Sequence, residues 1–152
     1  MSHELRAASE SDGEAIAAIR ENVLNTSQEG WAPNPDEDRV AVCDGAVVGW
    51  VQFYSSTQVE EIQRECAWIQ SLAVDPDHQG DGIGSALVQS VVADAKESGV
   101  DGVGFFLDPS GDVARRKRFF GDLGFNYVSP TEPPIWWVET RGAKMSSGEH
   151  RA

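Results

Sequence analysis

Apolar residues recur along the chain with two periods, one typical of strands and one typical of helices. Residues 4–7 fit a short strand, and Ser11 to Glu14 has the pattern of a capping box. Apolar residues at helical spacing follow it: Ile16, Ile19 and Val23. We therefore predict a strand and then a helix. The polar segment 26–38, which contains glycine and prolines, predicts a loop with room for a short helix.

Two β-rich runs surround an Asp-Gly pair in the next part of the chain. Residues 39–43 and 46–54 flank Asp44-Gly45, which is the strongest short signal for an antiparallel hairpin. A polar stretch, 55–65, leads into residues 67–74, whose apolar and β-branched content suits a central strand. The pattern thus predicts three strands, of which the first two are antiparallel neighbours.

A second kind of periodicity begins after the segment Asp75-Pro76-Asp77, which ends the central strand. Apolar residues then repeat at intervals of three and four, and Gly99 is suited to cap the helix that they predict. These residues are Leu87, Val88, Val91, Val92 and Ala95. Residues 103–107 are a further strand candidate. Strand, helix and strand here should form a right-handed parallel crossover.

The last part of the chain predicts one more helix and a final hairpin. The helix covers residues 112–123 with Gly124 as its cap, and the hairpin runs from Tyr127 to Val138. Residues 141–152 contain almost nothing apolar, so we expect a disordered tail. Residues 1–140 should therefore be a single domain, which suits a chain of this length.

Composition narrows the range of functions. The chain of 152 residues is 40% hydrophobic and 24% charged, as in soluble globular proteins. Its 25 acidic and 12 basic residues give a net charge of −13. Such a surface repels phosphates, so nucleic acid is an unsuitable partner. The scarcity of lysine resembles proteins of high-salt cytoplasms, and an ordinary acidic protein is the alternative. A monomer or a homodimer fits this size.

Cysteines and apolar runs exclude further classes. Cys43 and Cys66 lie far apart and make no metal-ligand spacing, so we expect buried thiols, no disulfide framework and no metal site. The sequence shows no long apolar run, leader or lipidation motif, so we expect a cytoplasmic protein that does not associate with membranes.

A glycine-rich loop separates the central strand from the long helix. Gln79-Gly80-Asp81-Gly82-Ile83-Gly84 lies where main-chain N–H groups at a helix N-terminus converge on an anion. Ser85-Ala86 follows instead of Lys and Ser or Thr, which excludes an ordinary P-loop. A purely structural turn and a Rossmann nucleotide loop remain as alternatives. The late position of the loop in the chain speaks against the Rossmann alternative.

The segment 72–87 resembles the acetyl-CoA signature of the GNAT N-acetyltransferase superfamily, Q/R-x-x-G-x-G/A after a strand that ends in an apolar-x-Val triplet. Residues 118–125 are similar to the last helix of that family, which ends in a Gly-Phe pair. The resemblance covers about residues 4–138. It implies an α/β (α+β) GNAT fold, with a mixed central sheet of about six to seven strands and about four flanking helices. It also implies that the sheet is splayed around the acetyl-CoA arm.

The resemblance further implies acetyl-CoA as co-substrate. N–H groups of the loop would hold its pyrophosphate, and the main chain of the preceding strand would pair with pantetheine. The implied coenzyme-binding residues are Leu72, Ala73, Val74, Gln79, Gly80, Asp81, Gly82, Ile83, Gly84 and Ser85. Asp81 departs from the basic or neutral residue usual in the family, so we expect its carboxylate to point to solvent.

The activity that the resemblance implies is transfer of an acetyl group to a primary amine of a small molecule, peptide or protein by direct attack. The family's base is often on the strand before the motif, where Trp68 and Gln70 stand here. Asp108, near the next strand's end, is the best remaining carboxylate, with a structural role as the alternative. Phe120 occupies the position of the family's usual tyrosine acid. A non-catalytic acyl-CoA-binding or sensing module is therefore the alternative function.

Overall fold

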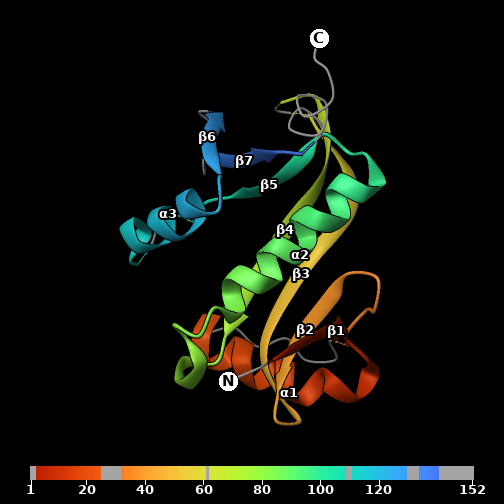
Figure 1. Cartoon of the computed structure of the whole chain (residues 1–152), viewed down its shortest axis with the longest axis vertical. Coiled ribbons are helices and arrows are strands. Elements are labelled where there is room, and N and C mark those ends of the chain that lie inside the picture. The colour runs from red at the N-terminus through yellow and green to blue at the C-terminus, as the bar shows by residue number, and fades with distance from the viewer. Residues whose placement is uncertain (1–2, 25–31, 61, 109–110, 130–133, 141–152) are drawn as a thin grey trace. The chain divides into compact units, whose positions relative to one another are not determined.

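The computed structural model describes residues 3–24, 32–60, 62–108, 111–129 and 134–140. These residues form seven strands and three α-helices (Figure 1). The elements are β1 (Glu4–Ala7), α1 (Gly13–Ile19), β2 (Asp38–Cys43), β3 (Ala46–Val59), β4 (Arg64–Val74), α2 (Ile83–Ser98), β5 (Gly102–Phe106), α3 (Val113–Asp122), β6 (Asn126–Ser129) and β7 (Ile135–Glu139). Short 3-10 turns precede α1 and α2, and a π-helical turn follows α1. The predicted tail, 141–152, lies outside the described residues.

The seven strands belong to one mixed sheet with the order β1-β2-β3-β4-β5-β7-β6. β1, β2 and β3 are antiparallel neighbours, whereas β4 and β5 are parallel. The predicted mixed sheet and the parallel strand–helix–strand unit are therefore confirmed. A Rossmann sheet is built from parallel strands, whereas the strands β1, β2 and β3 that precede the loop are antiparallel neighbours, so the Rossmann alternative is wrong. The described residues contain three α-helices, against the expected number of about four.

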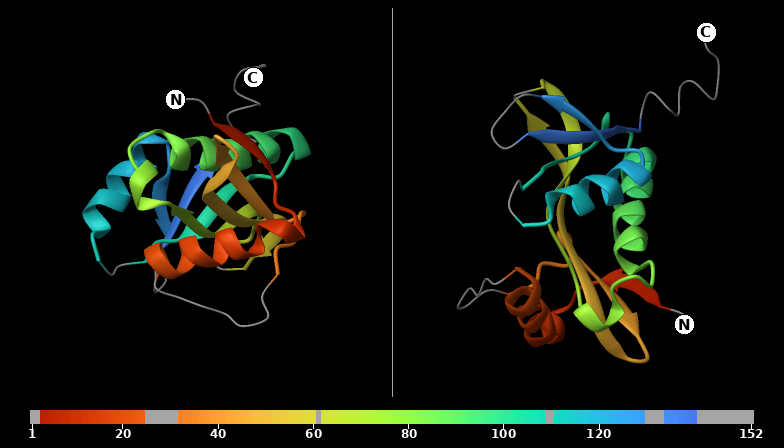
Figure 2. Two further views of the ribbon diagram at one scale, coloured as in Figure 1. Left: turned by 90° about the horizontal axis from the view of Figure 1, so that it is seen from below. Right: turned by 90° about the vertical axis from the view of Figure 1, so that its left-hand side faces the viewer.

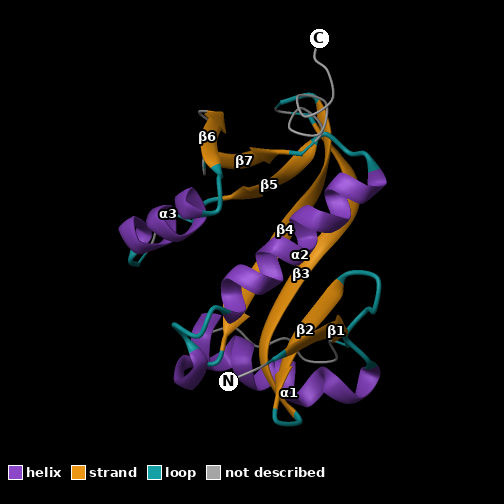
Figure 3. Cartoon of the chain, in the orientation of Figure 1, coloured by secondary structure: helices purple, strands orange, loops and turns teal. Residues whose placement is uncertain are grey.

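The chain divides into two compact units. Unit 1 comprises residues 1–54 and 70–90, and unit 2 comprises residues 55–69 and 91–152. Figure 3 shows β3 and β4 as strands and α2 as a helix. Each of these three elements contributes residues to both units. Each unit has its own cluster of buried apolar side chains. The expected single-domain organisation over residues 1–140 stays a prediction.

The hairpin of unit 1 has the turn that its sequence predicts. Asp44 and Gly45, between β2 and β3, have φ angles of 52° and 82°. Positive φ at both central residues is the geometry of a type I′ turn, whose twist matches that of the flanking strands. The predicted hairpin is confirmed.

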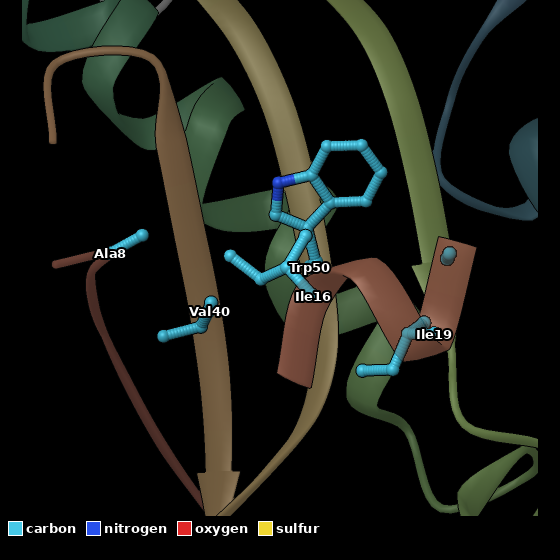
Figure 4. Close-up of a cluster of buried hydrophobic side chains, with 6 residues drawn as sticks. Ala8, Ile16, Ile19, Val40 and Trp50 are labelled. Carbon is cyan, nitrogen blue, oxygen red and sulfur yellow. The ribbon is translucent and has the colours of Figure 1, made fainter. Parts of the chain in front are cut away.

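The core of unit 1 is built around Trp50 of β3 (Figure 4). Its side chain is 1% exposed. It packs in a cluster with Ala8, which follows β1, and with residues of α1, β2 and β4: Ile16, Ile19, Val40 and Ala73. The indole N–H donates to Oδ1 of Asp38 over 2.8 Å, and Oδ2 of Asp38 accepts from the N–H of Asn34, also over 2.8 Å. A buried carboxylate needs such partners. Asp38 thus begins β2 rather than ending the predicted loop.

Helices cover both faces of the strands in unit 1 (Figure 2). α1 lies on the face to which Trp50 points, and the first turns of α2 lie on the other face, next to Gly49. Trp50 and Gly49 are consecutive, and consecutive residues of a strand point to opposite faces. The two neighbouring positions therefore serve two different helices.

The capping box lies earlier than predicted. Ser9 and Asp12 form it, instead of Ser11 and Glu14. Asp12 accepts a hydrogen bond from the Ser9 N–H over 2.8 Å and two from Arg6, over 2.7 and 3.0 Å. Because Arg6 belongs to β1, this ion pair joins the first strand to the helix start. The ion pair with Arg6 favours Asp12 over Glu14 as the acidic residue of the capping box. The capping-box pattern alone does not reveal this pairing.

Unit 2 contains the parallel pair and the final hairpin. β4 pairs with β5 from Cys66 and Gly102 to Trp68 and Gly104. β7 is antiparallel to both β5 and β6, and Tyr127 pairs with Trp136, which confirms the predicted hairpin. The sheet order places β7 between β5 and β6.

Strand β3 runs to Val59 and β4 begins at Arg64, so most of the stretch 55–65, which we did not predict as strand, belongs to strands. Val59 is buried and packs with Cys66, Trp68 and the β7 side chains. Burial of Val59 in this cluster therefore stabilises the otherwise polar end of β3. Arg64 lies over the Trp137 ring at 4.9 Å.

Both cysteines are buried, as predicted, with exposures of 5% for Cys43 and 0% for Cys66. Burial raises the pKa of the Cys66 thiol to about 12. Both side chains therefore act as small hydrophobic groups. In the described residues no helix is long and apolar enough to cross a membrane.

The Arg6–Asp12 pair predicts how stability depends on pH. The hydrogen bond from Arg6 lowers the pKa of Asp12 from 3.8 to about 2. The ionised carboxylate therefore stabilises the fold by about 2 kcal/mol above pH 4, and this contribution is lost as the pH falls toward 2. Asp12→Asn should reduce the free energy of unfolding at pH 7 by about that amount, with a smaller difference at pH 3, in urea titrations. The exposed turn variant Asp44→Asn should change it by less than about 0.5 kcal/mol. A difference for Asp12→Asn that is the same at both pH values would contradict this assignment.

Candidate functional site

The segment 75–82 connects β4 to α2 in unit 1 and contains the glycine-rich loop. It is attached to β3 at both of its ends. At the start, just after β4, the N–H of Asp75 donates to the carbonyl oxygen of Val48 over 2.8 Å. At the far end, Ile83 begins α2 and packs directly against Gly49. Two consecutive residues of one strand therefore fix where the loop starts and where the helix begins.

Hydrogen bonds within the loop hold its first half. Oδ1 of Asp75 accepts from the N–H of Asp77 over 3.0 Å, and the carbonyl oxygen of Asp75 accepts from the N–H of His78 over 2.8 Å. The side chain of Gln79 donates through Nε2 to the carbonyl oxygen of Val74 over 3.1 Å. Gln79 thus braces the loop with its side chain, a role that the sequence did not reveal.

Two glycines of the loop have left-handed backbone geometry. Gly80 has a φ of 93° and Gly82 a φ of 84°, a region that other residues rarely adopt. A Cβ added at either position would meet no heavy atom within 4 Å. The glycines are therefore required by the backbone conformation and leave open space beside the main chain. A ligand can approach the peptide groups closely there.

Main-chain donors gather where the loop meets α2. The N–H of Ala86 makes the first helical hydrogen bond, to the carbonyl oxygen of Gly82 over 3.0 Å. The N–H groups of Ile83, Gly84 and Ser85 precede it, so they belong to the helix turn that has no intrahelical acceptor. The first turn of α2 contains no acidic residue. The positive end of the helix dipole and these donors together suit an anion such as a phosphate.

No cationic side chain supports this anion site from within the loop. The segment 72–85 contains no lysine or arginine, and it contains Asp75, Asp77 and Asp81. The side chain of Asp81 is exposed, as expected. A phosphate here would be held by main-chain dipoles against a local excess of negative charge.

The strand residues before the loop differ in exposure. Leu72 and Val74 are half-buried, whereas Ala73 is 2% exposed and belongs to the Trp50 cluster. The Ala73 side chain thus contributes to the core, and only its main chain is available for pairing with a ligand.

The catalytic candidates belong to unit 2. Asp108 follows the end of β5 by two residues and is exposed, and its carbonyl oxygen accepts from Nη2 of Arg116 over 2.7 Å. Phe120 of α3 is 6% exposed, and its ring centroid lies 4.2 Å from that of Phe105 and 5.6 Å from that of Phe125. The position that the family uses for a tyrosine acid is therefore part of an aromatic core. The part of the chain that the structure describes holds no group of three or more metal-ligating side chains.

The family profile named Acetyltransferase (GNAT) family matches residues 5–125. The chain belongs to this family. It is 38% identical over 71 residues to an uncharacterized N-acetyltransferase of Methanocaldococcus jannaschii, a match that covers 45% of this chain and only 31% of that protein. The GNAT assignment confirms the predicted fold and the family's use of acetyl-CoA, and it supports acetyl transfer as the general chemistry.

Solved structures agree with the GNAT fold. The ribosomal-protein-S18-alanine N-acetyltransferase of Escherichia coli superimposes with a TM-score of 0.68 at 17% identity, over 99% of both chains. The N-acetylglutamate synthase of Neisseria gonorrhoeae, in complex with coenzyme A and N-acetyl-glutamate, has a TM-score of 0.69 at 21% identity, over 92% of this chain and 35% of that chain. These identities establish a shared fold and do not transfer a substrate.

The close contact of Gly49 with α2 was not predicted from the sequence, although the position of this glycine within a strand indicated one. A glycine inside a β-branched run such as 46–54 often marks the close approach of another backbone or helix. The structure identifies that neighbour as the first turn of α2.

The local charge predicts that Asp81→Asn tightens coenzyme A binding. Removing one negative charge near a pyrophosphate should improve the Kd about threefold to tenfold in low salt, and the gain should shrink in high salt because ions screen the repulsion. Isothermal titration calorimetry at two salt concentrations measures both effects. Asp44→Asn, which makes the same change in net charge at the β2–β3 turn, is the control. Equal gains from both variants would show an effect of net charge alone.

Proposed function

We propose that this GNAT protein is an N-acetyltransferase that binds acetyl-CoA at residues 79–85 and transfers its acetyl group to a primary amine. The observation that carries this proposal is the pair of left-handed glycines, Gly80 and Gly82, beside open space at the start of α2. The amine belongs to a small molecule, a peptide or a protein.

In this proposal the coenzyme is held mainly by main chain. The N–H groups from Gln79 to Ser85 would bind the pyrophosphate, and the main chain of 72–74 would pair with the amides of pantetheine. The fit is supported by donors that precede the first helical hydrogen bond and by the absence of any Cβ at Gly80, Gly82 and Gly84. Main-chain N–H groups can bind the pyrophosphate despite the nearby carboxylates, because the fold holds these donors in fixed positions.

The proposed reaction is direct attack. The amine nitrogen forms a bond to the thioester carbonyl carbon, the C–S bond breaks, coenzyme A leaves as thiolate, and the amine loses one proton. A lysine-like amine must first be deprotonated, at a cost of about 4 to 5 kcal/mol at pH 7. An α-amino group with a pKa near 8 costs only about 1 to 1.5 kcal/mol. The need for a base therefore depends on the acceptor.

We assign Asp108 as the candidate base. Its side chain is exposed just after the carboxyl end of β5, which allows contact with an incoming amine. Phe120 cannot protonate the leaving group. A thiol has a pKa of about 8.5, so coenzyme A can leave as thiolate without an acid.

The alternative function is a non-catalytic acyl-CoA-binding or sensing module. The buried Phe120 and the non-titrating Trp68 favour it, because both stand where relatives place catalytic side chains. For either function we propose a cytoplasmic protein, monomeric or homodimeric, and the acidic composition recommends assays over a range of KCl concentrations.

Gly82 provides the test of coenzyme binding. Gly82→Ala should weaken coenzyme A binding at least about tenfold, and Gly82→Glu should abolish it, since a side chain there fills the phosphate position and strains the backbone. Calorimetry with coenzyme A measures both effects. Gly99→Ala is the matched control, because Gly99 has a φ of 85° and equally open space at the other end of α2. Unchanged affinity in both Gly82 variants would remove the loop from the mechanism, and failure of the unaltered protein to bind acetyl-CoA would overturn the proposed function.

Asp108 provides the test of catalysis. Asp108→Asn should lower kcat about a hundredfold or more with a lysine-like acceptor and leave the Kd for coenzyme A unchanged. A thiol-release assay over a panel of amines measures turnover, with the exposed α3 variant Asp122→Asn as control. An unaltered rate would assign the base elsewhere. Coenzyme binding without turnover of any amine would favour the binding module.

A further inference from the structure

Val48 and Gly49 of β3 lie outside the glycine-rich loop but contact both ends of the connection between β4 and α2 that contains it. The carbonyl oxygen of Val48 accepts the N–H of Asp75 over 2.8 Å, which fixes the point where the chain leaves β4. At the other end of this connection, where α2 begins, a Cβ at Gly49 would lie 2.8 Å from Cγ2 of Ile83 and 3.1 Å from Cδ1 of Leu87. Both side chains are buried, with exposures of 2% and 0%.

The two contacts at Gly49 differ in how easily they yield. Cδ1 of Leu87 is the end of a flexible side chain, and a rotation can move it away. Cγ2 of Ile83 is attached to Cβ, and a β-branched side chain in a helix has one strongly preferred χ1 rotamer. A methyl group at Gly49 would therefore displace the helix backbone at Ile83 rather than its side chain alone.

Displacement of Ile83 moves the donors of the anion site. The peptide N–H groups of Ile83, Gly84 and Ser85 belong to the first turn of α2, and a main-chain donor has no rotamer with which to recover its direction. A shift of a few tenths of an ångström lengthens several hydrogen bonds to a bound phosphate at once, and each lost hydrogen bond to a charged group weakens binding roughly tenfold to a hundredfold. The strand face at Gly49 thus determines where the donors point.

We propose that Val48 and Gly49 form a positioning platform for the pyrophosphate loop, and that the missing side chain at Gly49 sets the affinity for coenzyme A. The inference rests on the proposed coenzyme site and assigns to it two residues that need not touch the coenzyme. Val48 holds the start of the loop through its carbonyl oxygen, and Gly49 admits the first turn of α2 to the strand surface.

The experiment is a titration of coenzyme A by calorimetry into the full chain and five variants. Gly49→Ala should raise the Kd roughly tenfold to a hundredfold, which is the loss of about one hydrogen bond to a charged group. Adding Ile83→Leu, which keeps the side-chain volume and removes the methyl group on Cβ, should restore most of the affinity. Ile83→Leu alone gives the reference Kd for the double variant, because Ile83 belongs to the proposed binding loop. In that background Gly49→Ala should raise the Kd by less than about threefold, since its new methyl group no longer meets a methyl group on Cβ.

Two further variants separate positioning from general destabilisation. Ile16→Val weakens the core of the same unit on the opposite face of the strands, so it should lower Tm without changing the Kd. Gly121→Ala adds a methyl group to α3 where nothing lies within 4 Å, so it should leave the Kd unchanged and raise Tm slightly, because alanine is the better helix former.

The outcomes distinguish this inference from the function on which it rests. No binding of coenzyme A by the unaltered protein would overturn the proposed function. Binding by the unaltered protein with the same Kd for Gly49→Ala would overturn the platform alone. A weakened Gly49→Ala that Ile83→Leu does not rescue, or an Ile16→Val whose Kd rises in step with its loss of Tm, would also overturn it. Loss of affinity in Gly49→Ala, rescue in the double variant and an unchanged Kd in Ile16→Val would establish it.

Discussion

The close contact between β3 and the first turn of α2 is the constraint on which the candidate site depends. Gly49 has no side chain, so Ile83 and Leu87 lie directly against the strand. An anion site made of side chains can adjust by changing rotamers. A site made of peptide N–H groups cannot, and its accuracy is that of the helix position. In the proposed site the packing of buried Ile83 therefore positions the phosphate donors, whereas many phosphate sites rely on charged side chains.

The same strand serves the opposite face with its largest residue. Trp50 follows Gly49, fills the core under α1 and donates its indole N–H to the buried carboxylate of Asp38. Because side chains alternate along a strand, a large residue and an absent one can be neighbours without conflict. The tryptophan anchors β3 within unit 1, and the glycine transmits that fixed position to the loop. Stability and ligand geometry are thus joined in two consecutive residues.

Coenzyme binding and acetyl transfer rest on different kinds of chemistry in this GNAT protein. The proposed binding residues would contribute main-chain groups of unit 1, which depend on glycines at the right positions rather than on particular charged side chains. Transfer would depend on side chains, and here the chain departs from its family. Phe120 packs against Phe105 and Phe125 in unit 2, so an aromatic contact occupies the position of the usual acid. Coenzyme A can leave without an acid more easily than an alkoxide could, because a thiol with a pKa of about 8.5 gives a weakly basic thiolate.

Local patterns in the sequence determined most of the secondary structure and the glycine-rich loop. The Asp44-Gly45 turn, the long helix capped by Gly99 and the loop glycines depend on steric rules that act within a few residues. The capping residue Asp12, the strand ends at 55–59, the burial of Asp38 and the role of Gly49 were decided only by tertiary structure. Each of these depends on a partner in a different element of the fold: Arg6 of β1, the Cys66–Trp137 cluster, Trp50 of β3, and Ile83 with Leu87 of α2. Periodicity shows which face of an element is buried, but it does not show which residue lies opposite, and that residue decides whether a carboxylate, a polar strand end or a missing side chain fits.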